Sequence, residues 1–219
     1  MGQPIHVVIP FKNEGTKSRL ASVLSPQERR LLSFAMLTDV LDAVLGQGRA
    51  TTILSRPGLD IADIGYNVEI QESELVLNDA LNSLIACEAR QGWQLDILIV
   101  MADLALLTEK DVVGILNCDG DVVLCPGRGG GTNMILIRSP KFRTCYHGLS
   151  FPKHLALARQ AGLEVSIYES FRAGCDIDEP EDLAEVLLHG RGRSKNVLED
   201  MGFALSENGR AGLCRPNNL

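Results

Sequence analysis

Long apolar runs, cysteine pairs and an excess of positive charge are all missing from this sequence of 219 residues. No apolar stretch reaches the roughly 18 residues of a membrane-spanning helix, so we expect no membrane span. None of the six cysteines forms a C-x-x-C pair and the four histidines are scattered, which disfavours a zinc or iron–sulfur site. The net charge of −7 disfavours a nucleic-acid polymer or an anionic membrane as the main partner. No basic-then-apolar signal region opens the chain, and we expect a cytoplasmic protein with reduced cysteines.

Two glycine-rich nucleotide-binding motifs are missing as well. The loop after the first expected strand contains neither G-x-G-x-x-G nor G-x-x-x-x-G-K-[ST]. The sequence therefore disfavours a dinucleotide-binding dehydrogenase and a Walker-type phosphate loop. A nucleotide is still an admissible ligand, because a metal ion and a few local cations can offset the charge of its phosphates.

What the sequence does contain is a regular alternation of expected strands and helices, with 45% apolar and 22% charged residues. Apolar runs predict strands, and apolar residues at helical spacing predict helices. The predicted strands cover residues 5–9, 51–54, 67–70, 96–101, 121–125, 134–137 and 164–168, and the predicted helices cover 26–45, 78–90, 108–116, 152–161 and 180–188. Ser25, Pro26 and Glu28 predict a capping box at the first helix.

Repeated strand–helix units predict an α/β fold with three α/β/α layers and a mixed, mostly parallel sheet. The segment 127–150 interrupts the alternation, and we expect an antiparallel section there. We expect one domain over residues 1–189. Residues 190–219 then form a C-terminal appendage with a short helix at 194–201 and a loose end.

Three carboxylates lie where a sheet of this kind binds ligands. Asp103 follows a strand that reads as buried on both faces, and Asp176 and Asp178 form an Asp-Ile-Asp pair far along the chain. Carboxylates without histidine or cysteine favour a hard cation, and we predict Mg²⁺ bound by all three. The alternative for Asp103 is a helix cap.

Basic residues gather in the loop after the first strand, where Lys12, Lys17 and Arg19 lie close to Gly15. Such side chains suit the phosphates of a nucleoside triphosphate, and arginine can hold phosphate oxygens in a fork. The alternative is a solvated basic surface loop.

Two later segments suggest anion binding. A glycine run at 127–131 leads into Thr132 and Asn133, and glycines let backbone N–H groups approach an anion closely. Further on, Gly148 and Ser150 precede a helix whose first amides form a second natural anion site. The alternatives are a flexible turn or hairpin for the glycine run and a plain N-cap for Ser150.

Two further polar residues have open roles. Asn78 begins an expected helix and either contacts a base or ribose or caps that helix. His154, on the first turns of a later helix, either packs, caps or touches ligand.

Taken in order along residues 5–188, these pieces resemble the 2-phospho-L-lactate guanylyltransferase family, which acts in biosynthesis of the deazaflavin coenzyme F(420). The resemblance lies in the segments 17–20, 77–81, 102–106, 130–133, 150–154 and 176–183. Residues 190–219 contribute nothing to it. The resemblance implies a glycosyltransferase-A-like, nucleotide-diphospho-sugar transferase fold. It implies transfer of GMP from GTP to a small phosphorylated three-carbon acid, 2-phospho-L-lactate, by a homodimer.

The resemblance also assigns roles to residues. Asp103, Asp176 and Asp178 match the metal-binding positions of the family, and Lys17 and Arg19 match the loop expected over the nucleotide. The positions that hold the phosphorylated acid are matched by the residues Thr132, Ser150 and Gly148.

Two positions depart from the family pattern and leave the acceptor open. Ala105 stands where proline is usual, and His147 stands where glycine is common. Phosphoenolpyruvate, 3-phosphoglycerate or a sugar phosphate are alternative acceptors. A glycosyltransferase and a non-catalytic nucleotide-binding protein are further alternatives.

Overall fold

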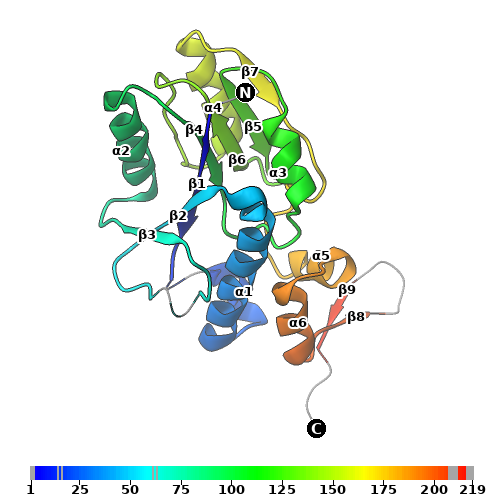
Figure 1. The fold of residues 1–219 in the computed structure, drawn as a ribbon. Helices are drawn as coiled ribbons and strands as arrows, with labels where there is room; N and C mark the ends of the chain where they lie inside the picture. Colours follow the sequence, from blue (N-terminus) through cyan, green and yellow to red (C-terminus); the bar gives the residue numbers. More distant parts are fainter. Residues whose placement is uncertain are drawn as a thin grey trace.

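A seven-stranded sheet is the centre of the molecule, shown as a ribbon in Figure 1. The computed structural model describes residues 3–13, 15, 17–60, 62, 64–206 and 212–215. The strands are β1 (Ile5–Phe11), β2 (Ala50–Ser55), β3 (Glu69–Glu72), β4 (Asp96–Val100), β5 (Val122–Pro126), β6 (Thr132–Ile137), β7 (Val165–Ile167), β8 (Ala204–Ser206) and β9 (Gly212–Cys214). The α-helices are α1 (Pro26–Val44), α2 (Leu77–Arg90), α3 (Glu109–Leu116), α4 (Ser150–Gln160), α5 (Asp182–His189) and α6 (Arg193–Asp200). Two short 3₁₀ helices, η1 (Ser18–Ser22) and η2 (Gly46–Gly48), flank α1.

The sheet has the order β3-β2-β1-β4-β6-β5-β7. β6 runs antiparallel to both of its neighbours, and the other neighbouring pairs are parallel. Val100, at the end of β4, pairs with Met134, near the start of β6. The beginning of β6 therefore lies at the edge where the parallel strands β1 to β4 end. The predicted mixed, mostly parallel sheet and the antiparallel section within 127–150 are confirmed.

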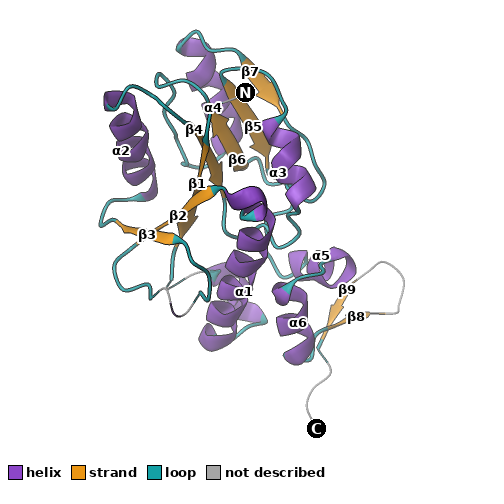
Figure 2. Cartoon of the chain, viewed as in Figure 1, coloured by secondary structure: helices purple, strands orange, loops and turns teal. Residues whose placement is uncertain are grey.

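Helices cover both faces of the sheet (Figure 2). Alternate residues of the central strands point to opposite faces: Leu98 and Val100 of β4 join one core, whereas Ile97 and Ile99 join the other. α1 and α3 contribute to the first core, and α2 and α4 contribute to the second. The predicted three-layer α/β/α architecture is confirmed.

Two capping boxes begin helices of the first layer. Ser25 accepts a hydrogen bond from the Glu28 backbone N–H, while the Glu28 carboxylate accepts from the Ser25 N–H. Thr108 and Asp111 make the same arrangement at α3. The predicted box at Ser25 is confirmed, and it fixes the direction in which α1 leaves the ligand edge of the sheet.

The segment after α5 packs against the rest of the chain. α5, α6, β8 and β9 lie together beside α1 in Figure 1, and their apolar residues share a third core cluster with α1. The predicted short helix is present as α6, whereas the antiparallel β8–β9 pair was not predicted. Residues 207–211 and 216–219, on which part of the expected loose end falls, lie outside the described residues. The domain boundary at residue 189 stays a prediction. Within the described segments, no helix has the length and apolar character needed to cross a membrane.

Candidate active site

Lys17 joins two carboxylates from distant parts of the chain. Asp103 follows β4, and Asp178 precedes α5. The Lys17 Nζ donates to Asp103 Oδ2 at 2.7 Å and to Asp178 Oδ1 at 2.8 Å. Burial by itself would lower the pKa of Lys17, but the negative charges of Asp103 and Asp178 raise it above its ordinary value. Lys17 is therefore a fully charged ammonium ion held between the two acids.

Asp176 lies beside this junction and is hydrogen-bonded to Asn133 of β6. Its Oδ1 accepts from the Asn133 amide at 3.3 Å, and the same amide donates to the Ala173 carbonyl at 2.9 Å. Burial raises the pKa of Asp176; the Asn133 amide opposes that shift, and the nearby charges of Asp103 and Asp178 add to it. The three carboxylates thus share one electrostatic environment, although only Asp103 and Asp178 share a hydrogen-bond donor.

The chemistry of these donors fits a hard divalent cation. Asp103 Oδ1 is buried and has no hydrogen-bond partner among the described residues, so this oxygen is available to a ligand. All the candidate ligand atoms are carboxylate oxygens, which Mg²⁺ prefers. No group of three acidic, histidine or cysteine side chains stands ready to hold a metal among the residues that the structure describes. The ammonium of Lys17 takes the position between Asp103 and Asp178, and the three-carboxylate metal site stays a prediction.

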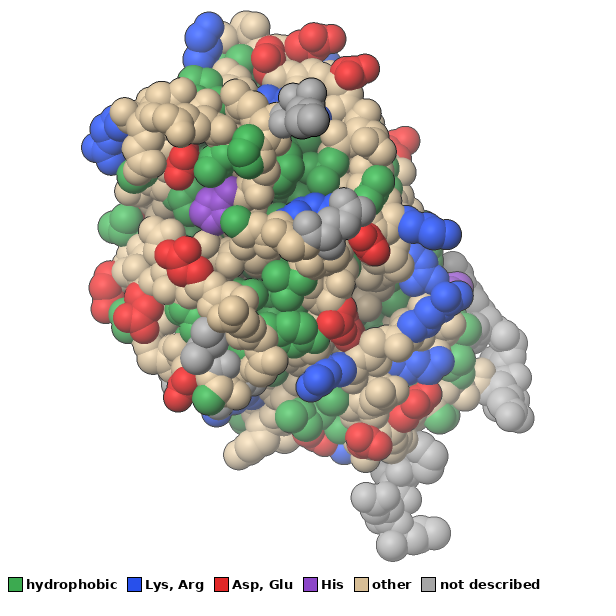
Figure 3. All heavy atoms as spheres, viewed as in Figure 1, with side chains coloured by type: hydrophobic (Ala, Val, Ile, Leu, Met, Phe, Trp, Pro, Cys, Tyr) green, Lys and Arg blue, Asp and Glu red, His purple; other side chains and the backbone are tan. Residues whose placement is uncertain are grey.

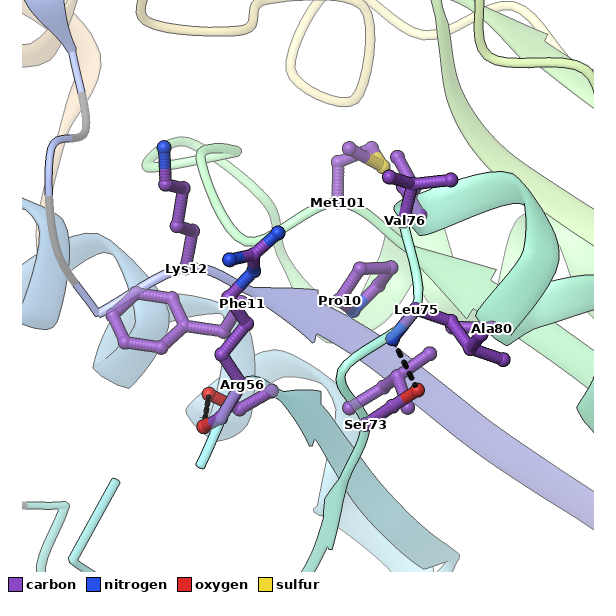
Figure 4. A pocket seen from close by; sticks show the side chains of 12 residues that line it. Pro10, Phe11, Lys12, Arg56, Ser73, Leu75, Val76, Ala80 and Met101 are labelled. Atoms are coloured by element: carbon purple, nitrogen blue, oxygen red, sulfur yellow. Dashed lines mark hydrogen bonds between the residues drawn. The ribbon is translucent and has the colours of Figure 1, made fainter. Parts of the chain in front are cut away.

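Two adjoining cavities meet at Lys12, and one of them reaches Lys17. One, of about 320 Å³, is lined in part by Lys12, Lys17, Asp103 and Asp178. The other, of about 350 Å³ and largely apolar, lies at the ends of β1 and β2 and the start of α2 (Figure 4). Its wall is formed by Pro10, Phe11, Lys12, Leu54, Ser55, Arg56, Ser73, Leu75, Val76, Leu77, Ala80 and Met101. The cavities share Pro10, Phe11, Lys12 and Met101, so one ligand can extend through both.

The basic loop is divided between the cavity and the surface. Lys12 lines both cavities, whereas Arg19 is largely exposed and lies 3.6 Å from Asp178 Oδ2 and 3.4 Å from Glu179. On the face that Figure 3 shows, basic and acidic side chains are interspersed among apolar ones.

A second polar cluster lies on the other side of β6, around Thr132. Thr132 Oγ1 lies 2.8 Å from His154 Nδ1 and accepts from Ser150 Oγ at 3.2 Å. Ser150 is the first residue of α4, and the residue before the helix is Leu149, so the interpretation of Ser150 as the N-cap is wrong. His154 is completely buried and bonds to Thr132, which identifies it as a packed structural residue of this cluster.

The loops around this cluster depend on two glycines. Gly130 (φ 79°) and Gly148 (φ 58°) have left-handed backbone conformations that favour glycine. The Gly130 carbonyl accepts from the Phe151 N–H at 3.2 Å, which ties the glycine loop to the first turn of α4. The glycine run is therefore the turn of the antiparallel β5–β6 hairpin, as the hairpin alternative predicted, and it is hydrogen-bonded to the first turn of α4.

Asn78 lies inside α2 rather than at its cap, which is Val76. The interpretation of Asn78 as a helix cap is wrong, because its Oδ1 accepts from the Tyr146 N–H at 2.6 Å. Asn78 holds the segment before α4 against α2, and a contact with the nucleotide stays a prediction.

The apolar cavity wall was not predicted from the sequence. Arg56 and Ser73 follow β2 and β3, and Leu75 and Val76 are exposed apolar residues just before α2. The signal that could have found them is the position directly after a parallel strand, the same signal that identified Asp103. The role of Lys17 as the partner of two acids was also missed.

Comparisons with known proteins identify the family of this chain. A family model described as guanylyl transferase CofC like matches residues 5–214. The chain is 51% identical over 210 residues to 2-phospho-L-lactate guanylyltransferase of Methanothrix thermoacetophila, a match that covers 94% of each chain. It is 42% identical over 205 residues to the protein of that name in Haloarcula marismortui, covering 94% of this chain and 96% of that one.

The chain belongs to the CofC-like guanylyl transferase family. It is a nucleotidyltransferase, and the predicted family membership is confirmed. The family match extends to residue 214 and so includes α6 and the β8–β9 pair, beyond the segment in which the resemblance was found.

Solved structures confirm the nucleotide-diphospho-sugar transferase fold. A putative nucleotide-diphospho-sugar transferase from Desulfovibrio desulfuricans G20 has a TM-score of 0.72 at 17% identity, covering 91% of this chain and 95% of that one. A nucleotidyl transferase from Methanothermobacter thermautotroptrophicus has a TM-score of 0.61 at 15% identity, covering 91% of this chain and 100% of that one. At these identities the likeness concerns the fold alone.

Proposed function

We propose that this chain transfers GMP from GTP to 2-phospho-L-lactate and releases pyrophosphate, in biosynthesis of the deazaflavin coenzyme F(420). The observation that carries the proposal is the junction of Lys17, Asp103 and Asp178, which lines one of the two connected cavities. The names of the relatives support transfer of a guanylyl group to 2-phospho-L-lactate.

The guanine base and ribose occupy the apolar cavity, and the phosphates extend toward Lys17. A purine ring gains from burial against Leu54, Leu75 and Met101, because these side chains remove apolar surface from water. Lys12 lies where the two cavities meet and offsets the charge of the phosphates. Arg19, at the outer end of the loop, has the planar geometry to hold phosphate oxygens as they enter.

The phosphorylated acid binds between β6 and the first turn of α4. Thr132 and Ser150 offer hydroxyl groups there, and the left-handed Gly148 lets the backbone amides of its loop approach an anion. Thr132 and Asn133 are adjacent on β6, and Asn133 contacts Asp176. The acceptor therefore sits next to the carboxylates that face the nucleotide phosphates.

The reaction requires two anions to meet, so positioning and charge neutralisation account for most of the rate. An oxygen of the acceptor phosphate attacks the α-phosphorus of GTP, and the bond from that phosphorus to pyrophosphate breaks. A phosphate nucleophile is already deprotonated at neutral pH, so the chain needs no general base. Asp103, Asp176 and Asp178 would hold Mg²⁺, which would neutralise phosphate charge when bound. Lys17 and Lys12 add positive charge at the same edge of the sheet.

The activity test is pyrophosphate release across a grid of substrates. Each of the four common nucleoside triphosphates is combined with 2-phospho-L-lactate, phosphoenolpyruvate or 3-phosphoglycerate, with and without Mg²⁺. We expect turnover with GTP and 2-phospho-L-lactate, dependent on Mg²⁺. Turnover only with another acceptor would reassign the substrate. This is the first alternative to check, because His147, beside Gly148, stands where glycine is common in the family. Absence of turnover in every combination would support a non-catalytic nucleotide-binding protein.

We also propose a homodimer in the cytoplasm, on the basis of the family resemblance. Sedimentation equilibrium of the purified protein, across a range of concentrations, measures the oligomeric state directly. A monomer at all concentrations would contradict this part of the proposal.

A further inference from the structure

His154 makes two hydrogen bonds whose directions are set by chemistry. Its Nε2 lies 2.8 Å from the backbone nitrogen of Cys145, and its Nδ1 lies 2.8 Å from Thr132 Oγ1. A backbone N–H can only donate, so Nε2 must accept and carry no proton. In the neutral ring the proton is then on Nδ1, and His154 donates to the Thr132 hydroxyl.

His154 is neutral at physiological pH because of its surroundings. The side chain is completely buried, and this burial lowers the pKa of His154 to about 4. Its ring lies 4.8 Å from the ring of Tyr146, in an edge-on arrangement, and 5.9 Å from that of Phe142. These contacts hold the ring plane, so the orientation of the Nδ1–H is fixed.

The tautomer of His154 decides whether the cluster has a hydrogen to offer a ligand. With the proton on Nδ1, His154 donates to Thr132, and one hydroxyl hydrogen is used between Thr132 and Ser150. The second hydroxyl hydrogen of the pair then has no acceptor within the cluster. With the proton on Nε2, Ser150 would donate to Thr132, Thr132 would donate to Nδ1, and both hydrogens would be consumed internally.

We propose that His154 is a positioning residue that directs one hydroxyl hydrogen of the Thr132–Ser150 pair toward the anionic acceptor. The Cys145 amide selects the tautomer, His154 supplies the donor, and the freed hydroxyl hydrogen bonds to a carboxylate or phosphate oxygen of the acceptor. His154 itself does not touch the substrate. This inference rests on the proposed function, which supplies the identity of the acceptor. It assigns a role to His154, which is not one of the residues proposed to bind the acceptor.

The kinetic test compares His154→Phe with a matched control. Phenylalanine keeps an aromatic ring for the contacts with Tyr146 and Phe142 but removes both hydrogen bonds. We expect the KM for 2-phospho-L-lactate to rise about 3-fold to 10-fold, with the KM for GTP changed less than about 2-fold, because the Thr132 hydroxyl keeps its hydrogen but loses the donor that fixes its direction. The control is His6→Phe. It removes a similar contact, between His6 Nε2 and Thr52 Oγ1 at 2.8 Å, near the start of β1 and away from the edge of the sheet where the cavities lie. That control should leave both KM values unchanged, and an equal rise in both KM values for His154→Phe would overturn the proposal.

A double-mutant comparison tests whether His154 acts through Thr132. Thr132→Val removes the hydroxyl group at nearly constant volume. If His154 works through that hydroxyl, the acceptor KM of the double variant equals that of Thr132→Val alone. Multiplied effects of the two changes would show that His154 acts by another route and would contradict the proposal.

Two measurements do not depend on turnover. Nitrogen-15 NMR of histidine-labelled wild-type protein should show the His154 ring protonated at Nδ1 and unprotonated at Nε2; the opposite tautomer would overturn the inference even if His154→Phe failed to fold. Calorimetry with 2-phospho-L-lactate should show about 3-fold to 10-fold weaker binding to His154→Phe. Wild-type binding without pyrophosphate release would refute only the proposed reaction, and this comparison would still decide the role of His154. A wild-type protein that binds no phosphorylated acid would refute both.

Discussion

Lys17 connects acids that lie 86 and 161 residues further along the chain, which makes it sensitive to replacement. Its side chain is 9% exposed, whereas those of Asp103 and Asp178 are 23% and 42% exposed. An ammonium ion in this position offsets two negative charges that would otherwise repel each other. The same two carboxylates would hold Mg²⁺, so the ammonium and the cation share these ligands in our proposal.

Replacing Lys17 separates its contribution to catalysis from its contribution to the stability of the carboxylate pair. In Lys17→Met we expect GMP transfer to fall at least about 100-fold, because positive charge at the phosphates is lost. We also expect the variant to be less stable without Mg²⁺ by about 2 kcal/mol, since Asp103 and Asp178 are left without their partner. Added Mg²⁺ should therefore raise the melting temperature of Lys17→Met more than that of the wild type. Lys195→Met, which removes only an exposed pair with Glu199, is the control, and an equal effect of Mg²⁺ on all three proteins would argue against shared ligands.

Asp103 has a buried oxygen, Oδ1, that finds no hydrogen-bond partner in the described part of the chain. We expect Asp103→Asn to lower Mg²⁺-dependent pyrophosphate release at least about 1,000-fold, because an amide cannot replace a negative ligand. The fold should be retained, as measured by circular dichroism. Asp119→Asn, on the exposed turn after α3, should have no effect on turnover. Near-normal turnover of Asp103→Asn would contradict the metal assignment.

The buried His154 side chain should make the free energy of unfolding depend on pH. Burial lowers its pKa in the folded state to about 4, below the ordinary value of 6.5. Between these values the unfolded chain binds more protons at His154 than the folded chain, so this contribution is fully present above pH 6.5 and is lost as the pH falls toward 4. A shift of this size corresponds to about 3 kcal/mol. Urea unfolding of the wild type and of His154→Phe should show their stability difference shrinking over this range; a constant difference would contradict the assigned protonation.

At the scale of elements, the ends of strands position the site. The glycine loop between β5 and β6 shows this most clearly, because Gly127 lies next to the side chains of Asn133 and Asp176. A Cβ atom at Gly127 would lie 2.5 Å from Asn133 Oδ1 and 3.0 Å from Asp176 Oδ1. Gly129, in the same loop, has nothing within 4 Å of such an atom. The two positions therefore form a matched pair.

We expect Gly127→Ala to displace Asn133 and Asp176 and to lower kcat/KM about 10-fold or more, since small displacements at a catalytic edge have large effects. Gly129→Ala should remain within about 2-fold of the wild type, because its methyl group meets open space. The two variants are compared by steady-state kinetics and by thermal unfolding. Equal kinetics of Gly127→Ala and Gly129→Ala would show that the contact between Asn133 and Asp176 does not matter for turnover.

The elements themselves were predictable from sequence, because each has a strong local pattern. The run before Asp103 is apolar on both faces and forms the central strand β4, and the box at Ser25 begins α1 as expected. The β8–β9 pair was not predictable, because three-residue strands carry too little pattern. The contacts of Lys17 and Asn78 were also missed, since they join segments that only the tertiary fold brings together.

At the scale of the whole molecule, a hydrogen-bonded contact between α1 and α6 joins the C-terminal segment to the rest of the chain. Asp39, a buried acid on α1, accepts from the backbone N–H groups of Arg193 at 2.6 Å and Ser194 at 3.0 Å. It therefore caps α6 from a distant helix and favours its positive N-terminal end. A Cβ atom at Gly192 would overlap the Asp39 carboxylate, so glycine at this position allows the close approach.

This junction predicts that residues 190–215 unfold together with the rest of the chain rather than as an independent appendage. Asp39→Asn replaces an acceptor oxygen with an amide that faces an N–H group, and we expect a loss of about 1–3 kcal/mol in a single unfolding transition. Asp42→Asn, three residues further along α1, is the control, because its exposed carboxylate meets Tyr66 instead of α6 and should cost less. Unfolding followed by circular dichroism and by protease cleavage within 190–215 should give the same midpoint for each variant. An earlier midpoint for cleavage in the wild type would mean that the C-terminal segment detaches separately, as a boundary at residue 189 would allow.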